Sequence, residues 1–197
     1  MKFTEEKLER AFTELLGQEG FSHHLGITLT RKPDDVLIED DLQIFLLTQY
    51  ANQGITVNEV KSIILQLKSL SSSDLYESNK TFLKMLSEGF ILKRENRNQK
   101  DIYIQLIDYS GLNNHRQPNA DDLISIAADK EERSFTFDEN GLYGNDKNIY
   151  KFVTQLEIIG TEKRIPDGIV YINGLPLVVF EFKSAIKTAE PIYDSHY

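Results

Sequence analysis

The sequence contains no cysteine, and only four of its 197 residues are histidines. A chain without thiols can form no disulfide framework, no thiolate metal site and no cysteine nucleophile. The neighbouring His23 and His24 follow a glycine turn, but so few histidines without any cysteine argue against a zinc site. We therefore expect the chain to fold and act without sulfur chemistry.

Long apolar segments are also missing. No run approaches the roughly 18 consecutive apolar residues of a membrane-spanning helix. After Met1 the chain continues with Lys2-Phe3-Thr4-Glu5 and lacks the apolar segment of a secretion signal. With 40% hydrophobic residues, the chain can bury the core of one domain. We expect a single domain over residues 1–197 of a cytoplasmic protein without a membrane partner.

Several catalytic signatures are absent as well. The sequence has no G-x-x-x-x-G-K-S/T phosphate loop, no G-x-S-x-G nucleophile elbow and no H-E-x-x-H metal motif. Any ATP-driven activity would therefore have to come from sequence outside this stretch.

Positive charge is scarce, because 22 lysines and arginines stand against 31 aspartates and glutamates, for a net charge of −9. Phosphate contacts come mainly from lysine and arginine, so this balance is unfavourable for binding nucleic acid alone. Two local basic groups stand out, one made of Lys93, Arg94, Arg97 and Lys100 and the other of Lys163, Arg164, Lys183 and Lys187. Each of these groups could equally well contact DNA or be part of an ordinary solvated surface.

The most informative stretch runs from Arg164 to Lys183. Two β-rich runs there flank Asn173-Gly174, the strongest short hairpin signal in a sequence. Polar residues interrupt these runs mainly at Asp167, Glu181 and Lys183, and strand alternation places Glu181 and Lys183 on one face. An acid and a base thus end a strand that we otherwise expect to be buried. Because buried charges must be paired or bind a metal, they form either a solvated ion pair where the strand surfaces or part of a site.

The arrangement of these residues resembles a known nuclease signature. Pro166-Asp167, thirteen further residues and then Glu181-x-Lys183 match the pattern of the PD-(D/E)XK nuclease superfamily. A closer resemblance adds the run Asn173-Gly174-Leu175-Pro176-Leu177-Val178, the opening Thr4 to Arg10 and the helix that enters Gly20-Phe21. With these, the chain is similar to the N-terminal nuclease domain of type I restriction enzyme R subunits.

This resemblance implies a fold, an activity and partners. The implied fold is an α/β (α+β) domain with a restriction-endonuclease-like mixed β-sheet flanked by helices. The implied activity is a metal-dependent endonuclease that hydrolyses double-stranded DNA without reading its sequence. Asp167, Glu181 and Lys183 are the implied catalytic residues, and Mg²⁺ is the implied cofactor, held by Asp167, Glu181 and the main-chain carbonyl of Phe182. The implied partners are DNA and the modification and specificity subunits of the same system.

The family also carries features that this sequence does not show. One is a Gln-x-x-x-Tyr motif after the hairpin, whereas no glutamine follows Lys183. Another is ATP-driven translocation, which belongs to downstream motor domains. We therefore expect the chain to be a fragment of a longer protein. Two alternatives stay open: a non-catalytic docking module for the modification subunits that keeps Glu181 and Lys183 as an ion pair, and a DNA repair nuclease of the same superfamily.

Apolar residues at helical spacing predict a first helix over residues 4–18. Thr4 is its expected cap, and its apolar stripe includes Phe12 and Leu15. Glu5 or Glu9 on this helix either assists a metal, as glutamates of related nucleases do, or is a surface acid favoured by the helix dipole.

The same spacing predicts three further helices, at residues 40–51, 57–70 and 73–89. We interpret them as a helical insertion over residues 38–90. Alternating apolar residues predict strands at residues 102–107, 135–137 and 151–159 besides the two runs of the hairpin.

The register of the hairpin bears directly on the candidate site. With a two-residue turn and an unbroken antiparallel ladder, Asp167 would lie opposite Phe180 and point away from Glu181. A shared metal therefore requires a three-residue loop with Gly174 in the left-handed conformation, or a bulge such as one at Gly168. Pro176, which cannot donate to the ladder, fits beside such an irregularity.

Overall fold

The computed structural model describes residues 4–70, 73–110, 147–160 and 162–183. The strand expected at residues 135–137 and the basic residue Lys187 lie outside these ranges.

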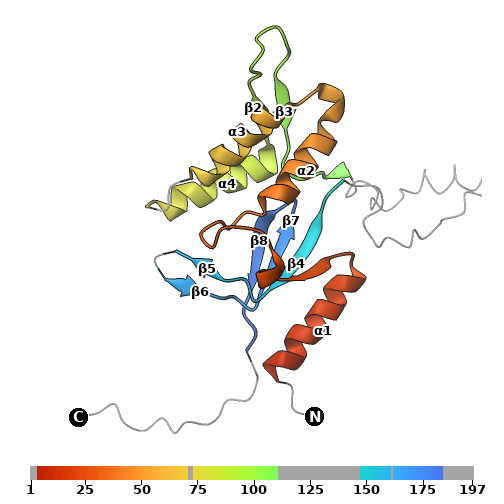
Figure 1. Cartoon of the computed structure of the whole chain (residues 1–197), viewed down its shortest axis with the longest axis vertical. Coiled ribbons are helices and arrows are strands. Elements are labelled where there is room, and N and C mark those ends of the chain that lie inside the picture. Colours follow the sequence, from red (N-terminus) through yellow and green to blue (C-terminus); the bar gives the residue numbers. More distant parts are fainter. Residues whose placement is uncertain (1–3, 71–72, 111–146, 161, 184–197) are drawn as a thin grey trace, which may run out of the picture.

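The central element is a mixed sheet of four strands in the order β1-β4-β7-β8 (Figure 1). Its strands are β1 (Ser22–Leu25), β4 (Tyr150–Thr154), β7 (Gly168–Ile172) and β8 (Leu175–Phe180). The strand β1 pairs in parallel with β4, and the other pairs are antiparallel. Two small antiparallel sheets pair β2 (Phe90–Leu92) with β3 (Ile102–Ile104) and β5 (Ile158–Ile159) with β6 (Lys163–Arg164).

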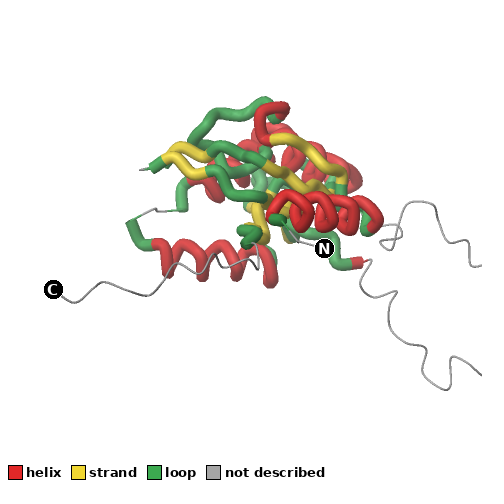
Figure 2. Tube along the Cα trace, turned by 90° about the horizontal axis from the view of Figure 1, so that it is seen from below, coloured by secondary structure: helices red, strands yellow, loops and turns green. Residues whose placement is uncertain are grey.

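Helices flank this sheet, as Figure 2 shows from below, so the expected α+β class is confirmed. They are α1 (Glu5–Gln18), α2 (Glu39–Gln49), α3 (Val57–Lys68) and α4 (Leu75–Glu88), with short 3-10 turns η1 (Gly26–Thr28) and η2 (Ala51–Gln53). All four expected helices are present to within a few residues. That residues 38–90 form an insertion stays a prediction. No described helix is long and apolar enough to cross a membrane.

Local signals explain where these helices begin and end. Thr56 caps α3 in a reciprocal capping box with Glu59, and the Asp74 side chain accepts from the first turn of α4. Gly89 ends α4 with a φ of 67°, which glycine adopts without strain. Thr4 occupies the cap position of α1, but its side chain makes no capping hydrogen bond.

The apolar residues form two cores. One lies among α2, α3, α4 and the β2–β3 hairpin, and it also contains Leu106 and Leu175. The other lies against the sheet and consists of Ile38, Val153, Leu156, Ile169 and Tyr171. Tyr171 of the core against the sheet and Leu175 of the core among the helices lie on the same β7–β8 hairpin. The hairpin therefore contributes to both cores.

The helix α1 packs on the sheet through aromatic rings. The ring of Phe12 lies 5.6 Å from that of Phe152, 4.5 Å from that of Phe180 and 5.6 Å from that of Phe182. No residue of α1 is fully buried, however, and Leu15 is 52% exposed. The expected apolar stripe therefore contacts the sheet at Phe12, and Leu15 is not part of the core.

Two strand predictions were wrong in part. The single strand expected at residues 151–159 is broken after Thr154, because Gln155 has a φ of 55° and the chain turns into β5 of another sheet. The strand expected at residues 102–107 is shorter and ends at Ile104. The strands β1, β2 and β6 were not predicted, since none contains more than four residues.

The strand β8 is also less buried than expected. It lies at the edge of the sheet, and Val178 and Val179 are 46% and 61% exposed. Its apolar sequence therefore reflects contacts at its two ends, where Leu175 enters the helical core and Phe180 contacts Phe12.

Candidate functional site

The turn between β7 and β8 has two residues. Asn173 and Gly174 have φ values of 52° and 75°, and Ile172 pairs directly with Leu175. Positive φ at both central positions is typical of the type I′ turn that suits twisted hairpins. The sequence predicted either a three-residue loop or a bulge, and the prediction of a three-residue loop is therefore wrong.

A bulge occurs instead a few residues further along the hairpin. Tyr171 pairs with Pro176, whereas Val170 pairs with Val178, so Leu177 is an extra residue on β8. Pro176 stands next to it, where a residue without an N–H disturbs the ladder least. The expected irregularity between Asp167 and Glu181 is thus confirmed, but it lies near the turn and not at Gly168.

This bulge sets the register at the end of the hairpin. Beyond it, Ile169 pairs with Val179 and Gly168 with Phe180. The pairs end there, and Asp167 and Glu181 are the next residues of the two chain segments. In this register their positions are opposed, whereas without the bulge Asp167 would be opposed to Phe180.

A hydrogen bond fixes Asp167 in this position. The main-chain N–H of Phe182 donates to Oδ2 of Asp167 at 2.6 Å. Asp167 is half-buried, whereas Glu181 and Lys183 are exposed. Within the described residues Glu181 and Lys183 do not form an ion pair with each other. The solvated ion pair considered for these two residues is therefore not present in this structure.

The middle of β7 supports this arrangement. Tyr171 is fully buried, and its hydroxyl donates to the carbonyl of Val36 at 2.9 Å. Burial raises the pKa of Tyr171 to about 12. The hydroxyl therefore stays protonated near neutral pH and holds the loop before α2 against the sheet.

The first helix does not complete a cluster of acids at this end of the sheet. Among the described residues, no three histidines, aspartates or glutamates are grouped closely enough to hold a metal ion together. Glu9 is half-buried on α1, one turn before Phe12.

The basic groups identified in the sequence are only partly available to a ligand. Arg94 is buried in an ion pair with Glu59, with 2.7 Å between Nε and Oε1. For Arg94, both expected alternatives, contact with DNA and a solvated surface position, are therefore wrong. Lys163 and Arg164 are exposed but paired, with Glu157 at 2.6 Å and Glu162 at 3.6 Å.

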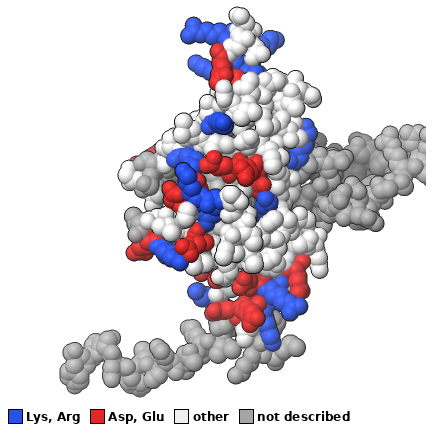
Figure 3. Space-filling model, in the orientation of Figure 1, with Lys and Arg blue, Asp and Glu red and all other residues white. Residues whose placement is uncertain are grey.

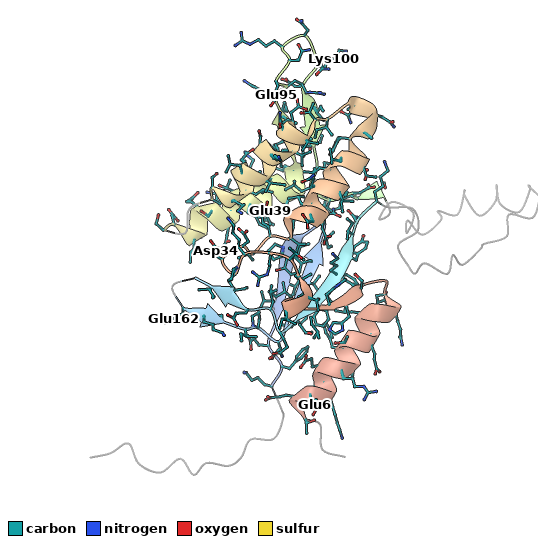
Figure 4. The ribbon with its side chains drawn as sticks, in the orientation of Figure 1. Glu6, Asp34, Glu39, Glu95, Lys100 and Glu162 are labelled. Carbon is teal, nitrogen blue, oxygen red and sulfur yellow. The ribbon has the colours of Figure 1, made fainter. Side chains whose placement is uncertain are left out.

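Three cations remain exposed on the loop between β2 and β3, namely Lys93, Arg97 and Lys100. Figure 3 shows positive charge at this tip. Figure 4 places Lys100 and Glu95 there, at the opposite end of the molecule from Glu6 on α1. The tip is also remote from the ends of β7 and β8 that carry Asp167 and Glu181 (Figure 1). The structure therefore does not bring these cations and the two carboxylates together.

Comparisons with known proteins identify the family of this chain. The chain matches the family described as type I restriction enzyme R protein N terminus over residues 2–194. It is 28% identical over 139 residues to the type I restriction enzyme HindI endonuclease subunit of Haemophilus influenzae, covering 69% of this chain and 10% of that protein. It is 23% identical over 198 residues to the putative type I restriction enzyme MjaIXP endonuclease subunit of Methanocaldococcus jannaschii, covering 96% of this chain and 16% of that protein.

No solved structure matches the chain. The chain spans no more than 16% of the length of the two curated relatives, and the family match extends over nearly all of its own residues. The chain belongs to the family of type I restriction enzyme R protein N-terminal regions.

Proposed function

We propose that this chain is the metal-dependent endonuclease module of a type I restriction enzyme R subunit. It hydrolyses phosphodiester bonds of double-stranded DNA without reading their sequence. The observation that carries this proposal is the bulge at Leu177, because the register beyond it supports opposed positions for Asp167 and Glu181. The names of the two relatives, both endonuclease subunits, support the same activity.

The residues present fit Mg²⁺. This ion prefers oxygen ligands, keeps several waters and is commonly bound by only one or two carboxylates together with substrate phosphates. Asp167 and Glu181 would supply the carboxylates, and the main-chain carbonyl of Phe182 would be a third ligand. Since Oδ2 of Asp167 accepts from the Phe182 N–H, Oδ1 is the oxygen left for the ion. When bound, the ion would activate a water and offset the charge that develops on the phosphate.

The chain's own residues have separate tasks in this proposal. The Phe182 N–H orients the Asp167 carboxylate, and the edge position of β8 leaves Glu181 open to a large substrate. Lys183 is not a ligand for a hard cation, since its ammonium has no lone pair. It stabilises negative charge on the phosphate or orients the attacking water.

The net charge of this chain and its short length relative to its relatives suggest which other parts of the enzyme it needs. A module with a net charge of −9 contributes little to holding DNA, so the modification and specificity subunits and the rest of the R subunit would do so. ATP would act only through motor domains outside these residues. In the cell we place the whole assembly in the cytoplasm.

A plasmid-nicking assay tests the catalytic assignment. With Mg²⁺, the wild-type chain should convert supercoiled plasmid to open circles, and Asp167→Ala and Glu181→Ala should each reduce this rate at least about 100-fold. Both variants should also lose metal binding in a calorimetric titration. Lys183→Ala should keep metal binding and lose rate, because it removes charge stabilisation and not a ligand.

Stability measurements separate a catalytic defect from unfolding. Glu181 is exposed, so Glu181→Ala should melt near the wild-type temperature. Asp167→Ala also removes the acceptor of the Phe182 N–H, so it should melt a few degrees lower and still unfold cooperatively. Glu162→Ala, which changes an exposed glutamate of the same segment, is the matched control and should nick normally. A wild-type chain that binds no Mg²⁺ and never nicks would instead favour the non-catalytic docking module.

A further inference from the structure

The end of β4 carries a residue in an unusual conformation. Gln155 has a φ of 55° and is exposed. Positive φ is uncommon for residues other than glycine, and asparagine and aspartate tolerate it better than most. The presence of glutamine at this position therefore needs an explanation.

The fold explains the turn at this position. Directly after Gln155, Leu156 is fully buried in the core against the sheet. Gly26 of η1 packs on the same backbone, since a Cβ there would lie 2.4 Å from Cα of Leu156. A left-handed residue at 155 lets the chain leave β4 and bury Leu156. Glycine or asparagine would meet that requirement with less strain, so the turn does not explain the glutamine side chain.

The sheet places Gln155 at the same end as the two carboxylates. Thr154, the last residue of β4, pairs with Gly168 of β7, and Gly168 pairs with Phe180 of β8. Gln155 is the next residue after β4, Asp167 directly precedes β7, and Glu181 directly follows β8. The three residues therefore lie at the same end of three adjacent strands.

A hollow of about 570 Å³ lies at this end of the sheet, next to Gln155. Gln155 lines it together with Ile165, two residues before Asp167, and with Leu25 and Ile27 from the region of η1. These three aliphatic residues are 46%, 47% and 92% exposed, respectively. Exposed apolar side chains around a hollow with a few polar groups are typical of a ligand-binding surface.

The charged side chains that line the hollow are largely engaged elsewhere. The terminal nitrogens of Arg31 donate to the main-chain carbonyls of Lys32 at 2.9 Å, Asp35 at 2.7 Å and Glu157, and its Nε is buried without a hydrogen-bond partner among the described residues. The carboxylate of Glu157 pairs with Lys163. Gln155 is therefore the exposed polar side chain of this lining, whereas the free N–H of Arg31 is buried.

We propose that Gln155 is a DNA-contacting residue of the endonuclease site, and that its carboxamide N–H donates to a phosphate oxygen of the strand being cut. The aliphatic wall formed by Leu25, Ile27 and Ile165 packs against the neighbouring sugar. An uncharged donor suits this place, because a third carboxylate would repel the phosphate and a lysine would pair with Asp167 or Glu181. This inference rests on the proposed nuclease function.

Substitution by glycine separates the contact from the turn. Gln155→Gly removes the carboxamide but adopts positive φ freely, so the variant should melt at the same temperature as the wild type or a few degrees higher. Its kcat/KM for plasmid nicking should fall about 10-fold to 100-fold, mainly through a higher KM for DNA. Its affinity for Mg²⁺, titrated without DNA, should not change.

Two further variants complete the experiment. Gln155→Asn keeps a carboxamide and tolerates the turn, so it should recover part of the lost kcat/KM. Gln99→Gly, at an exposed glutamine on the loop between β2 and β3, is the control and should nick as the wild type does.

Each outcome decides between specific alternatives. If the wild type nicks and Gln155→Gly nicks with the same kcat/KM, the DNA contact is wrong and the nuclease function stands. If Gln155→Gly melts several degrees lower, the glutamine is retained for stability and the contact is again wrong. If the wild type does not nick with Mg²⁺, both the contact and the proposed function fail.

Discussion

At the scale of single residues, Asn173 does more than form a turn. It is fully buried, and its Oδ1 accepts from the Ile149 N–H at 2.8 Å. Its Nδ2 donates to the carbonyl of Leu106 and to Oδ1 of Asn148, both at 2.9 Å. The neighbouring Gly174 is equally constrained, since a Cβ there would lie 2.1 Å from the carbonyl oxygen of Ile38. The Asn-Gly pair therefore meets demands of the backbone and of the tertiary structure together.

Replacing Asn173 by alanine should destabilise the protein by about 3 kcal/mol, because the Ile149 N–H and the carbonyl of the buried Leu106 both lose their hydrogen bond to this side chain. Urea unfolding at equilibrium measures this loss. Asn98→Ala, at an exposed asparagine of the β2–β3 loop, should change stability by less than about 0.5 kcal/mol. A loss below about 1 kcal/mol for Asn173→Ala would mean that water takes over its hydrogen bonds.

At the scale of elements, a buried ion pair attaches the β2–β3 hairpin to α3. Arg94 donates to Glu59, and it also donates to the carbonyls of Gln53 at 2.9 Å and Gly54 at 2.7 Å. Glu59 accepts from the main-chain N–H groups of Thr56 at 2.9 Å and Glu95 at 3.3 Å. Both charges are thus well hydrogen-bonded, which is the condition under which a buried pair is tolerated.

The pair should make stability depend on pH. Burial by itself raises the pKa of Glu59, but hydrogen bonds from the Thr56 and Glu95 main chain and from Arg94 outweigh it, so the pKa lies below the ordinary 4.5. As pH falls below about 4.5, the unfolded chain takes up this proton before the folded chain does. The free energy of unfolding should therefore decrease on acidification through the folded pKa.

Unfolding in urea between pH 3 and pH 7 measures this effect. Glu59→Gln should be less stable than the wild type at pH 7 and should lose less on acidification, because it has no proton to take up at this site. Glu77→Gln, which alters an exposed glutamate of α4, should keep the wild-type pH dependence. Identical pH profiles for Glu59→Gln and the wild type would refute the assignment.

At the scale of the whole molecule, the turn between β7 and β8 contacts both the helical core and the core against the sheet. Tyr171 belongs to the core against the sheet, whereas Leu175, four residues later, belongs to the core among the helices. The Ile38 N–H, just before α2, donates to the Gly174 carbonyl at 2.9 Å. Lys151 of β4 pairs with the buried Asp41 of α2 at 2.8 Å. The hairpin that carries the candidate site is therefore held by both cores.

We expect the two cores to unfold in one cooperative transition. Hydrogen exchange in increasing urea should give the same opening free energy for peptides from α2 and α3 as for peptides from β7 and β8. Asn173→Ala should lower both values equally, because this residue connects the two regions. Separate transitions for the helices and the sheet would contradict the expectation and would show that residues 38–90 behave as an independent insertion.

The sequence by itself determined the features that depend on near neighbours. Helical spacing located α1 to α4, and Asn173-Gly174 located the hairpin, because these patterns record which side of one element is buried. The resemblance of the stretch around Asp167 and Glu181 also pointed to the family to which the chain belongs. The need for an irregular ladder followed from strand alternation together with the shared metal that this resemblance implies.

The tertiary structure alone decided the rest. The bulge lies at Leu177, because the turn must place Asn173 and Gly174 against Ile149, Ile38 and Leu106 before the ladder continues. The parallel pairing of β1 with β4 joins residues more than a hundred positions apart. The burial of Arg94 and the turn at Gln155 depend on partners from other elements, Glu59 and the Gly26 backbone. Spacing along the chain contains no record of such contacts, because their free energy is gained only when distant segments meet.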